Sequence, residues 1–574
     1  MRLPSALTPL RHKIFRILWG ANVVVSLGVW MQNTGAGWLM TSLSPDPLTV
    51  SMVQAATILP VFMLALPAGA LADIIDKRLF IVATQCWMLT AAATLAVTTY
   101  LGHTTASSLL LLTFAIGVGA AMNSPAWGSV MAEVVPRRDL AQAIALNGVG
   151  FNLARAIGPA LAGLLVLAGG PALAFGLNAI SYLAVILVLL GWHRRTRTPN
   201  LPREQLLSAM RVGMRFVRFT PIMRAAMLRS AAFFGPAAAP WAMLPLVVRE
   251  QLHLGAGSYG ILLGLMGIGG VTAGMLLPQI RARLSRGNTV FFSSLCSYAG
   301  IAILGVSRHW LPAAIGMVMF GVGWVAASAV AQSAAQLSAP AWVRSRALAI
   351  YQLAFNGAMV VGTFFWGWLG TQVGLTVALL AAAGAGLVLA VVARGFDLDR
   401  QPAPAEASAA PVPPSPEAVA PELDSVVRGT RGKIMESQHY TIDQANQEKF
   451  LSVMAEVRDV RGRAGATIWG LYEDVAHPDF WLEVWTVETW TDHLREAMRL
   501  SEDDRAILAR AQAFQAGDRL PQRRYIAVSP HRLPAGAMPA VTMPAVTMPA
   551  VTMSAVTMSA VTMSAWALRA RNPG

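Results

Sequence analysis

Ten polar side chains stand within long apolar stretches of the sequence, and they are its first candidates for binding chemistry. Amide groups donate and accept hydrogen bonds, and a guanidinium pairs with anions, so these side chains could bind a polar solute where water is scarce. The candidates for substrate contact and translocation are Asn22, Gln32, Asn33, Gln54, Asn152, Arg155, Gln332, Gln336, Gln352 and Asn356. For most of them, hydrogen bonding between helices explains the polar residue at least as well as substrate contact.

Arg155 is the charged member of this set and lies one helical turn before Gly158. A charge in the middle of an apolar helix costs free energy on every insertion scale, so its side chain is expected to face a cavity. Two roles stay open at this stage: substrate binding or gating, and a structural role in which the guanidinium bonds to backbone carbonyls or to a neighbouring helix.

The segment from Gly69 to Arg78 combines small residues with two carboxylates and a Lys-Arg pair. Gly69 allows helices to approach closely, and Asp73 can accept hydrogen bonds from a helix N-terminus and oppose the two cations. We predict a gate that closes one side of the protein, formed by Gly69, Asp73, Asp76, Lys77 and Arg78. A loop that is basic only for topological reasons would explain Lys77 and Arg78, but not the whole spacing.

Several other chemistries find no support in the residues. The sequence has no G-x-x-x-x-G-K-[ST] loop, and the glycines at 267, 269, 270 and 274 lie inside an apolar stretch with no strand before them, where they are expected to pack helices. Cys86 and Cys296 also lie in apolar runs and read as packing residues. We therefore expect no cofactor, no metal site, no catalytic residues and no enzyme activity.

The elements that must position these residues are transmembrane helices. The chain of 574 residues is 55% hydrophobic and 13% charged, with a mean hydropathy of +0.53, whereas globular chains carry about 25% charge. The apolar runs predict twelve helices, at 14–42, 48–72, 79–101, 107–133, 143–168, 171–192, 222–249, 256–280, 288–307, 310–337, 346–370 and 372–396. They form two six-helix halves, 1–192 and 222–396, joined by a polar, basic loop at 193–221.

The basic residues predict the orientation in the membrane. One set of short loops carries nine of them, Lys77, Arg78, Arg137, Arg138, Arg281, Arg283, Arg286, Arg344 and Arg346, against Arg249 and Arg308 on the other side. By the positive-inside rule the first side is cytoplasmic, which makes both termini cytoplasmic in a multi-pass protein of the cell membrane. The net charge of +15 is explained by these loops, so no nucleic-acid partner is expected.

The C-terminal third differs in composition. A Pro/Ala-rich linker is predicted at 397–432. An α+β domain follows at 433–529, with strands at 434–442, 467–472, 480–487 and 525–528, a helix capped by Asp443 with Phe450, Met454 and Val457 on one face, and a second helix marked by Trp490. The order βαββαβ indicates a ferredoxin-like fold. The tail, 530–574, repeats MPAVT and then MSAVT and is expected to be disordered; a Met-rich site for soft Cu(I) is the weaker alternative.

Two motifs resemble known sequences. The Gly69–Arg78 segment resembles the G-x-L-a-D-r-x-G-r-[KR] signature of the major facilitator superfamily, although Ile74 and Asp76 replace the usual Arg and Gly. Gly158, Pro159, Ala162 and Gly163 are similar to the G-P-x-x-G-G element of exporters in that superfamily. Further segments, including those around Trp469 and Trp490, look like the branch that contains the enterobactin exporter and the transmembrane secretion effectors.

The resemblance implies a secondary transporter that exports a small organic compound, such as a siderophore, a drug or another amphipathic metabolite, by alternating access. Its partners would be that substrate, membrane lipid and a coupling ion, for which the family suggests H+. The acidic residues before 396 lie at or near loops, so Glu133, Asp73 or the substrate's own charge would have to serve. The α+β domain is expected to be a regulatory module, with a homodimer through this domain as one form; a small monooxygenase-like enzyme acting on the exported compound is the alternative.

Overall fold

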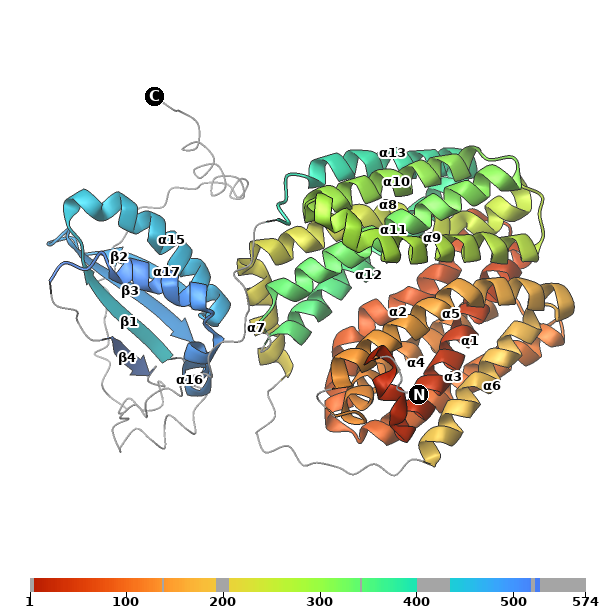
Figure 1. The fold of residues 1–574 in the computed structure, drawn as a ribbon, viewed down its shortest axis with the longest axis horizontal. Coiled ribbons are helices and arrows are strands. Elements are labelled where there is room, and N and C mark those ends of the chain that lie inside the picture. Colours follow the sequence, from red (N-terminus) through yellow and green to blue (C-terminus); the bar gives the residue numbers. More distant parts are fainter. Residues whose placement is uncertain are drawn as a thin grey trace, which may run out of the picture. The chain divides into compact units, whose positions relative to one another are not determined.

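The structure, a computed structural model, describes residues 5–136, 139–191, 206–340, 343–399, 434–517 and 522–526. Within them, twelve helices are long and apolar enough to cross a membrane. The first six are α1 (Lys13–Leu43), α2 (Pro47–Ile74), α3 (Lys77–Tyr100), α4 (Ala106–Glu133), α5 (Leu140–Gly169) and α6 (Pro171–Leu190). The second six are α8 (Pro221–Leu246), α9 (Ala256–Arg283), α10 (Arg286–Val306), α11 (Trp310–Ser338), α12 (Arg344–Val373) and α13 (Leu375–Ala393). Figure 1 shows these helices as two groups, as the sequence predicts.

The two halves repeat the same backbone device between their fifth and sixth helices. Gly170, with φ 74° and ψ 175°, links α5 to α6, and Gly374, with φ 84° and ψ 163°, links α12 to α13. L-residues with a side chain rarely adopt a positive φ, so glycine is the residue that can end one helix and start the next within a single position. The matching links place corresponding helix pairs in corresponding positions, as expected for a protein built from two related six-helix repeats.

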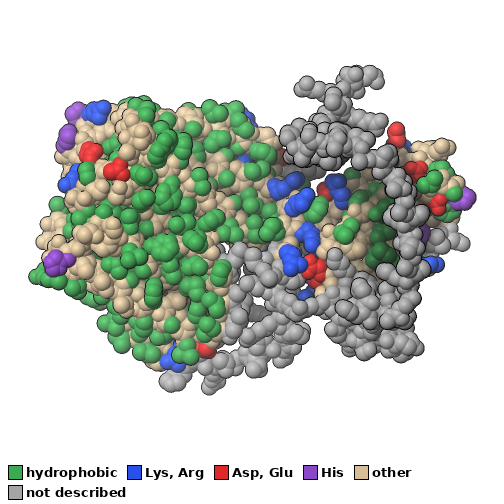
Figure 2. All heavy atoms as spheres, turned by 180° about the vertical axis from the view of Figure 1, so that it is seen from behind, with side chains coloured by type: hydrophobic (Ala, Val, Ile, Leu, Met, Phe, Trp, Pro, Cys, Tyr) green, Lys and Arg blue, Asp and Glu red, His purple; other side chains and the backbone are tan. Residues whose placement is uncertain are grey.

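Each half has its own apolar interior and a hydrophobic outer surface. Phe233, Phe234 and Phe320 are buried in the second half, and Phe15 and Ile81 in the first. Large side chains on the outside are hydrophobic too, among them Leu111, Leu187, Ile268, Val361 and Val388. Figure 2 shows hydrophobic side chains spread over much of one face of the helical part. An apolar exterior of this extent suits a lipid environment rather than water.

The predicted loop at 193–221 is only partly a loop. Its second part forms a helix, α7 (Leu206–Phe219), while residues 192–205 lie outside the described residues. The apolar residues Leu207, Met210, Met214 and Val217 recur at helical spacing with arginines between them, which is the pattern of an amphipathic helix. The abundance of basic residues concealed this periodicity.

The C-terminal part has the predicted ferredoxin-like topology. Its elements are β1 (Ile434–Thr441), α15 (Gln447–Ala464), β2 (Ile468–Glu473), β3 (Phe480–Val487), α16 (Trp490–Arg499), α17 (Glu502–Gln512) and β4 (Arg523–Ile526). The sheet order is β2-β3-β1-β4, and β3 pairs antiparallel with both β1 and β2. Phe450, Met454 and Val457 of α15 are buried in its core, as the apolar periodicity predicts.

Three details of this part differ from the expectations. Asp443 precedes a short 3-10 helix, η4 (Gln444–Asn446), and makes no capping hydrogen bond with its side chain, and α15 begins only at Gln447. A further helix, α17, follows α16; its start is fixed by a reciprocal capping box between Ser501 and Asp504. β4 begins at Arg523, ahead of the expected Tyr525.

The boundaries of the linker and the tail lie largely outside the described residues. The predicted linker at 397–432 is described only at its start, where Asp399 accepts hydrogen bonds from the backbone N–H groups of Arg286 (2.6 Å) and Gly287 (2.9 Å) at the beginning of α10. Leu398 beside it is buried. The second half therefore extends to Asp399. The tail at 530–574 is not described.

Candidate functional site

A cavity of about 490 Å³ lies between the two halves. Its described walls come from α1, α2 and α5 of the first half and from α8, α9, α11 and α12 of the second. The aromatic lining residues are Trp30, Phe151, Phe234, Trp241, Tyr259, Trp324, Tyr351 and Phe355. The polar and charged lining residues are Asn33, Thr34, Gln54, Thr57, Arg155, Ser328, Gln332, Gln352 and Asn356. A cavity of this size with apolar walls and a few polar groups is typical of a site for a small organic molecule.

Six of the ten residues proposed for substrate contact line this cavity: Asn33, Gln54, Arg155, Gln332, Gln352 and Asn356. The other four do not. Asn22 donates a hydrogen bond to Asn147 (3.3 Å), Gln32 accepts one from Asn178, and Asn152 donates to the carbonyl of Gly148 (2.9 Å). Gln336 is exposed away from the cavity lining. The alternative of hydrogen bonding between helices thus describes Asn22 and Gln32, whereas Asn152 bonds within its own helix.

Sequence reasoning did not select the aromatic walls. A chain of rings crosses the cavity from α1 to α12: the centroids of Trp30 and Trp241 are 6.1 Å apart, those of Trp241 and Trp324 5.6 Å, and those of Trp324 and Phe234 4.8 Å. Phe234 continues to Phe355 at 4.3 Å. In a chain with apolar residues on every helix, the tertiary structure alone tells which aromatic side chains face inward.

Arg155 reaches from α5 of the first half to α9 of the second. A Cβ placed on Gly270 would lie 3.3 Å from the Arg155 Nη2 atom and 2.7 Å from a methyl group of Val325. The missing side chain at Gly270 therefore leaves the space that the guanidinium occupies. Arg155 forms no hydrogen bond or ion pair with any described residue, and it is the one charged side chain among the described residues of the cavity lining.

The two halves meet tightly at the end of the bundle that carries the α1–α2 turn, residues 44–46. Three hydrogen bonds join the halves there: Thr371 donates to Asp46 (2.7 Å), the backbone N–H of Leu48 donates to Thr371 (3.1 Å), and Arg249 donates to Thr41 (3.0 Å). We call this region the closed end. The helices α2 and α12 also approach closely nearby: a Cβ on Gly367 would lie 2.0 Å from the Ser51 hydroxyl oxygen.

The helix-5 motif forms the second crossing at the closed end. A Cβ on Gly163 would lie 2.9 Å from the carbonyl oxygen of Ala256, and a Cβ on Gly260 would lie 2.4 Å from that of Pro159. Gly267, further along α9, has the same relation to Ala156, whose Cα would lie 2.7 Å away. The glycines of α9 therefore let it contact the backbone of α5 across the interface between the halves. Gly158 instead packs on Trp30, and Ala162 is buried.

Two residues of the proposed gate, Asp76 and Arg78, form hydrogen bonds with described residues of the first half. Asp76 caps α3 by accepting hydrogen bonds from the backbone N–H groups of Arg78 (3.0 Å) and Leu79 (3.1 Å). Arg78 donates to the carbonyls of Leu189 (2.8 Å) and Leu190 (2.6 Å) at the end of α6. Lys77 is the first residue of α3, and the surroundings of Gly69 and Asp73 in the last turns of α2 lie outside the described residues.

The sequence of this chain matches the model of a known protein family. The family model described as transmembrane secretion effector matches residues 4–532. The chain belongs to this family. One relative of this chain is the staphyloferrin A transporter of Staphylococcus aureus, which is 23% identical over 51% of this chain and 74% of that protein. The enterobactin exporter EntS of Citrobacter koseri is 22% identical over 66% of this chain and 90% of that protein.

Solved structures of other transporters share the fold of the helical part of this chain. A bacterial homologue of the human lysosomal transporter Spinster, in an inward-facing and unoccupied conformation, matches with a TM-score of 0.53 and 14% identity over 68% of this chain and 96% of that one. An auto-inhibited POT family peptide transporter matches with a TM-score of 0.56 and 14% identity, over 69% and 99%. At these identities the likeness establishes the fold, and the prediction of a twelve-helix major facilitator fold is confirmed.

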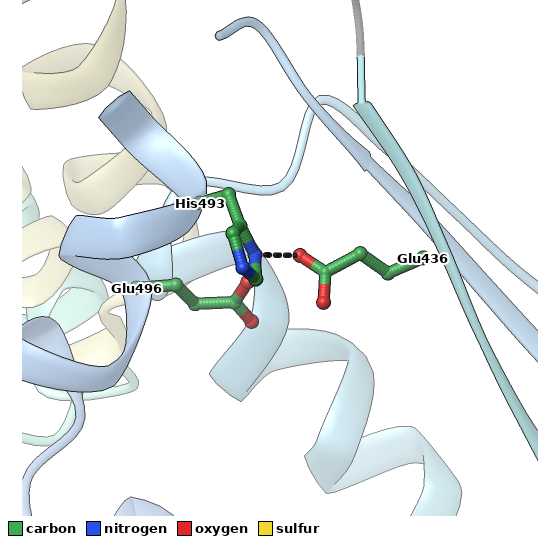
Figure 3. A group of neighbouring side chains, drawn as sticks. All are labelled: Glu436, His493 and Glu496. Carbon is green, nitrogen blue, oxygen red and sulfur yellow. Dashed lines mark hydrogen bonds and ion pairs between the residues drawn. The ribbon is translucent and has the colours of Figure 1, made fainter. Parts of the chain in front are cut away.

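A second cluster of titratable side chains lies in the ferredoxin-like part and was not predicted. His493 and Glu496 stand one turn apart on α16 and meet Glu436 of β1, with their ligand atoms within 4.8 Å of one another. Figure 3 shows the contact between His493 Nδ1 and Glu436 Oε1, which is 2.6 Å long. The spacing of His493 and Glu496 could have indicated that both side chains lie on one face of a helix. Glu436 could not have been assigned to the same cluster, because it is far away in the sequence and lies in a strand.

These three residues belong to a larger buried ion network. Arg461 donates to Glu483 (3.0 Å) and Glu496 (2.9 Å), and the indole N–H of Trp485 donates to the second oxygen of Glu496 (3.2 Å). The second oxygen of Glu436 accepts from Gln522 (2.6 Å). A divalent cation would find suitable ligand types here, but it would have to displace these protein donors. As it stands, the arrangement is an ion network that holds α15 and α16 on the sheet.

Burial and charge have opposite net effects on the pKa values of two of the three carboxylates of this network, Glu436 and Glu496. Burial would raise the pKa of Glu436, but the hydrogen bond from His493 and the charges of His493 and Arg461 outweigh it and hold that pKa below its ordinary value. Burial does raise the pKa of Glu496, because Arg461 offsets it only in part and Glu436 adds to it. Glu436 therefore stabilises the fold above its unfolded pKa, and this contribution is lost as the pH falls through its lower folded pKa.

Replacing Arg461 by methionine is expected to destabilise the ferredoxin-like part by about 3–5 kcal/mol, because two buried carboxylates lose their shared cation. Thermal unfolding of the purified protein, followed by tryptophan fluorescence, measures this. Arg458→Met is the matched control on the same helix: its side chain is 55% exposed and, among the described residues, pairs only with the neighbouring Asp459, so a loss below about 0.5 kcal/mol is expected. Equal stability of the two variants would show that the network does not support the fold.

Proposed function

We propose that this protein exports a small organic amphiphile across the cell membrane by alternating access through the central cavity. The observation that carries the proposal is a cavity of about 490 Å³ between two repeated halves, sealed at one end by the α5–α9 and α2–α12 crossings. Alternating access needs such a site between two bodies that separate at either end. The candidate translocation residues are the polar groups of the cavity lining.

The orientation follows from charge. The basic loops predict that the end bearing the α2–α3 turn faces the cytoplasm, with both termini on that side. On this assignment the closed end faces outward, and a compound would enter the cavity from the cytoplasm. The Gly69–Arg78 segment would then serve as the inner gate, changing partners when the cytoplasmic end shuts.

The relatives support export and suggest the kind of cargo. One is named as a transporter of staphyloferrin A and another as an exporter of enterobactin. A siderophore or a similar amphipathic metabolite is therefore the proposed substrate class. Proton antiport is the proposed coupling, on the strength of the superfamily resemblance alone.

The ferredoxin-like part is proposed to regulate the transporter, as a module able to pair with a second copy. Its internal ion network joins its own helices to its own sheet. Enzyme action on the exported compound remains the competing role.

One experiment tests both proposals: untargeted mass spectrometry of cells and medium, comparing strains without the protein, with the full chain, and with a chain ending after Arg400. The full chain should raise the medium-to-cell ratio of at least one small organic compound, and the shortened chain should retain measurable export. An unchanged ratio with the full chain would contradict the transport function. A product made by the full chain but not by the shortened one would favour the enzyme alternative.

A further inference from the structure

Two residues that line the cavity carry hydrogen-bond donors for which the described residues supply no acceptor. One is the guanidinium of Arg155, which has no hydrogen-bond or ion-pair partner among them. The other is the indole N–H of Trp241, whose nitrogen is buried and makes no hydrogen bond. Buried donors are normally paired, and each one left unpaired costs free energy.

The two donors belong to different halves of the protein. Arg155 is on α5 and Trp241 is on α8, and both line the same cavity. Trp241 also packs edge-on against Trp324, with centroids 5.6 Å apart. An acceptor that satisfies both donors would therefore connect the two halves while it is bound.

From these contacts we infer that the cavity holds a subsite for an anionic group, bound by Arg155 and Trp241, and that the exported compound is an anion with an aromatic or apolar body. This inference rests on the proposed function and names the charge class of its substrate. A carboxylate, sulfonate or phenolate accepts hydrogen bonds from both donors and neutralises the guanidinium. The ring chain from Trp30 to Phe355 offers faces on which an aromatic body can stack.

A cationic substrate fits this site poorly. The tryptophan rings could attract a cation through their faces, but a cation in the same cavity would face the positive charge of Arg155. The described lining residues include no carboxylate that could offset that repulsion.

The test is binding of two probes that share one ring system to the full-length protein in lipid nanodiscs. One probe is 1-anilinonaphthalene-8-sulfonate, an anion, and the other is N-phenyl-1-naphthylamine, its neutral counterpart without the sulfonate. Protein-free nanodiscs give the background. We expect the anion to bind at least about ten-fold more tightly, the size of effect that one charge-assisted hydrogen bond produces.

The variants separate charge from shape. Arg155→Gln should weaken binding of the anion about ten-fold and change binding of the neutral probe less than about two-fold. Trp241→Phe keeps an aromatic ring but removes the donor, and should weaken the anion more than the neutral probe. Arg308→Gln, on an exposed loop residue outside the cavity lining, should change neither probe.

A cavity-filling variant distinguishes failure of this inference from failure of the proposed function. Ser328 lines the cavity, so Ser328→Trp should weaken both probes. If Ser328→Trp weakens both while Arg155→Gln changes neither, the cavity binds ligands and the anionic subsite is wrong. If Ser328→Trp changes neither probe, the probes do not bind in the cavity and the anionic subsite is wrong, whereas the proposed export is contradicted only if the full chain leaves the medium-to-cell ratio unchanged.

Discussion

Replacing Arg155 by alanine is expected to abolish efflux while the protein still inserts into the membrane at the wild-type level. The guanidinium is the charged group of the described cavity lining and makes no hydrogen bond or ion pair with a described residue. A structural arginine would be bonded to carbonyls or to a neighbouring helix, and its removal would cost stability. Gly270, which the Arg155 guanidinium approaches, offers no such bond.

The measurement is export of the compound identified by mass spectrometry, normalised to the amount of protein in the membrane. Loss of the interaction with a charged ligand should lower export by about ten-fold or more. Arg155→Lys should rescue poorly, because an ammonium lacks the planar fork of the guanidinium. Export that falls only in proportion to a lower protein level would assign Arg155 a structural role.

Replacing Gly260 by leucine is expected to stop the transport cycle by keeping the closed end from closing. A Cβ at this position would lie 2.4 Å from the carbonyl oxygen of Pro159 and 3.0 Å from the Cα atom of Gly163. Both are backbone atoms of α5, so no side-chain rearrangement can relieve the clash. Overpacking of this kind costs about 1–3 kcal/mol, which corresponds to a loss of about 5- to 150-fold in the population of the closed state.

The matched control is Gly274→Leu on the same helix, because an added Cβ at Gly274 would meet nothing within 4 Å. Both variants should insert normally, since α9 keeps its apolar character. Export by Gly260→Leu should fall at least about five-fold while Gly274→Leu stays near wild type. Full export by Gly260→Leu would mean that the α5–α9 crossing does not need to form during the cycle.

The membrane helices follow from the sequence because a bilayer leaves few structural solutions. Every backbone polar group in lipid must be bonded within its own segment, so each apolar run of sufficient length becomes a helix, and polar turns separate the runs. The predicted ranges therefore agree with the structure to within a few residues. The ferredoxin-like topology is equally accessible, because strands and helices of period two and 3.6 alternate in the required order. The amphipathic α7 was missed since its arginines hide the same periodicity.

The choice among polar side chains was decided only by the tertiary structure. Gln32 and Asn33 are adjacent on α1, yet one bonds to Asn178 of α6 and the other lines the cavity. Successive residues on a helix point about 100° apart, so the rotation of α1 against its neighbours sets their roles. A uniformly apolar helix carries no amphipathic stripe from which that rotation could be read. Glu436 and His493 show the same limit in the ferredoxin-like part, where the packing of α16 against the sheet brings together two groups that the sequence separates widely.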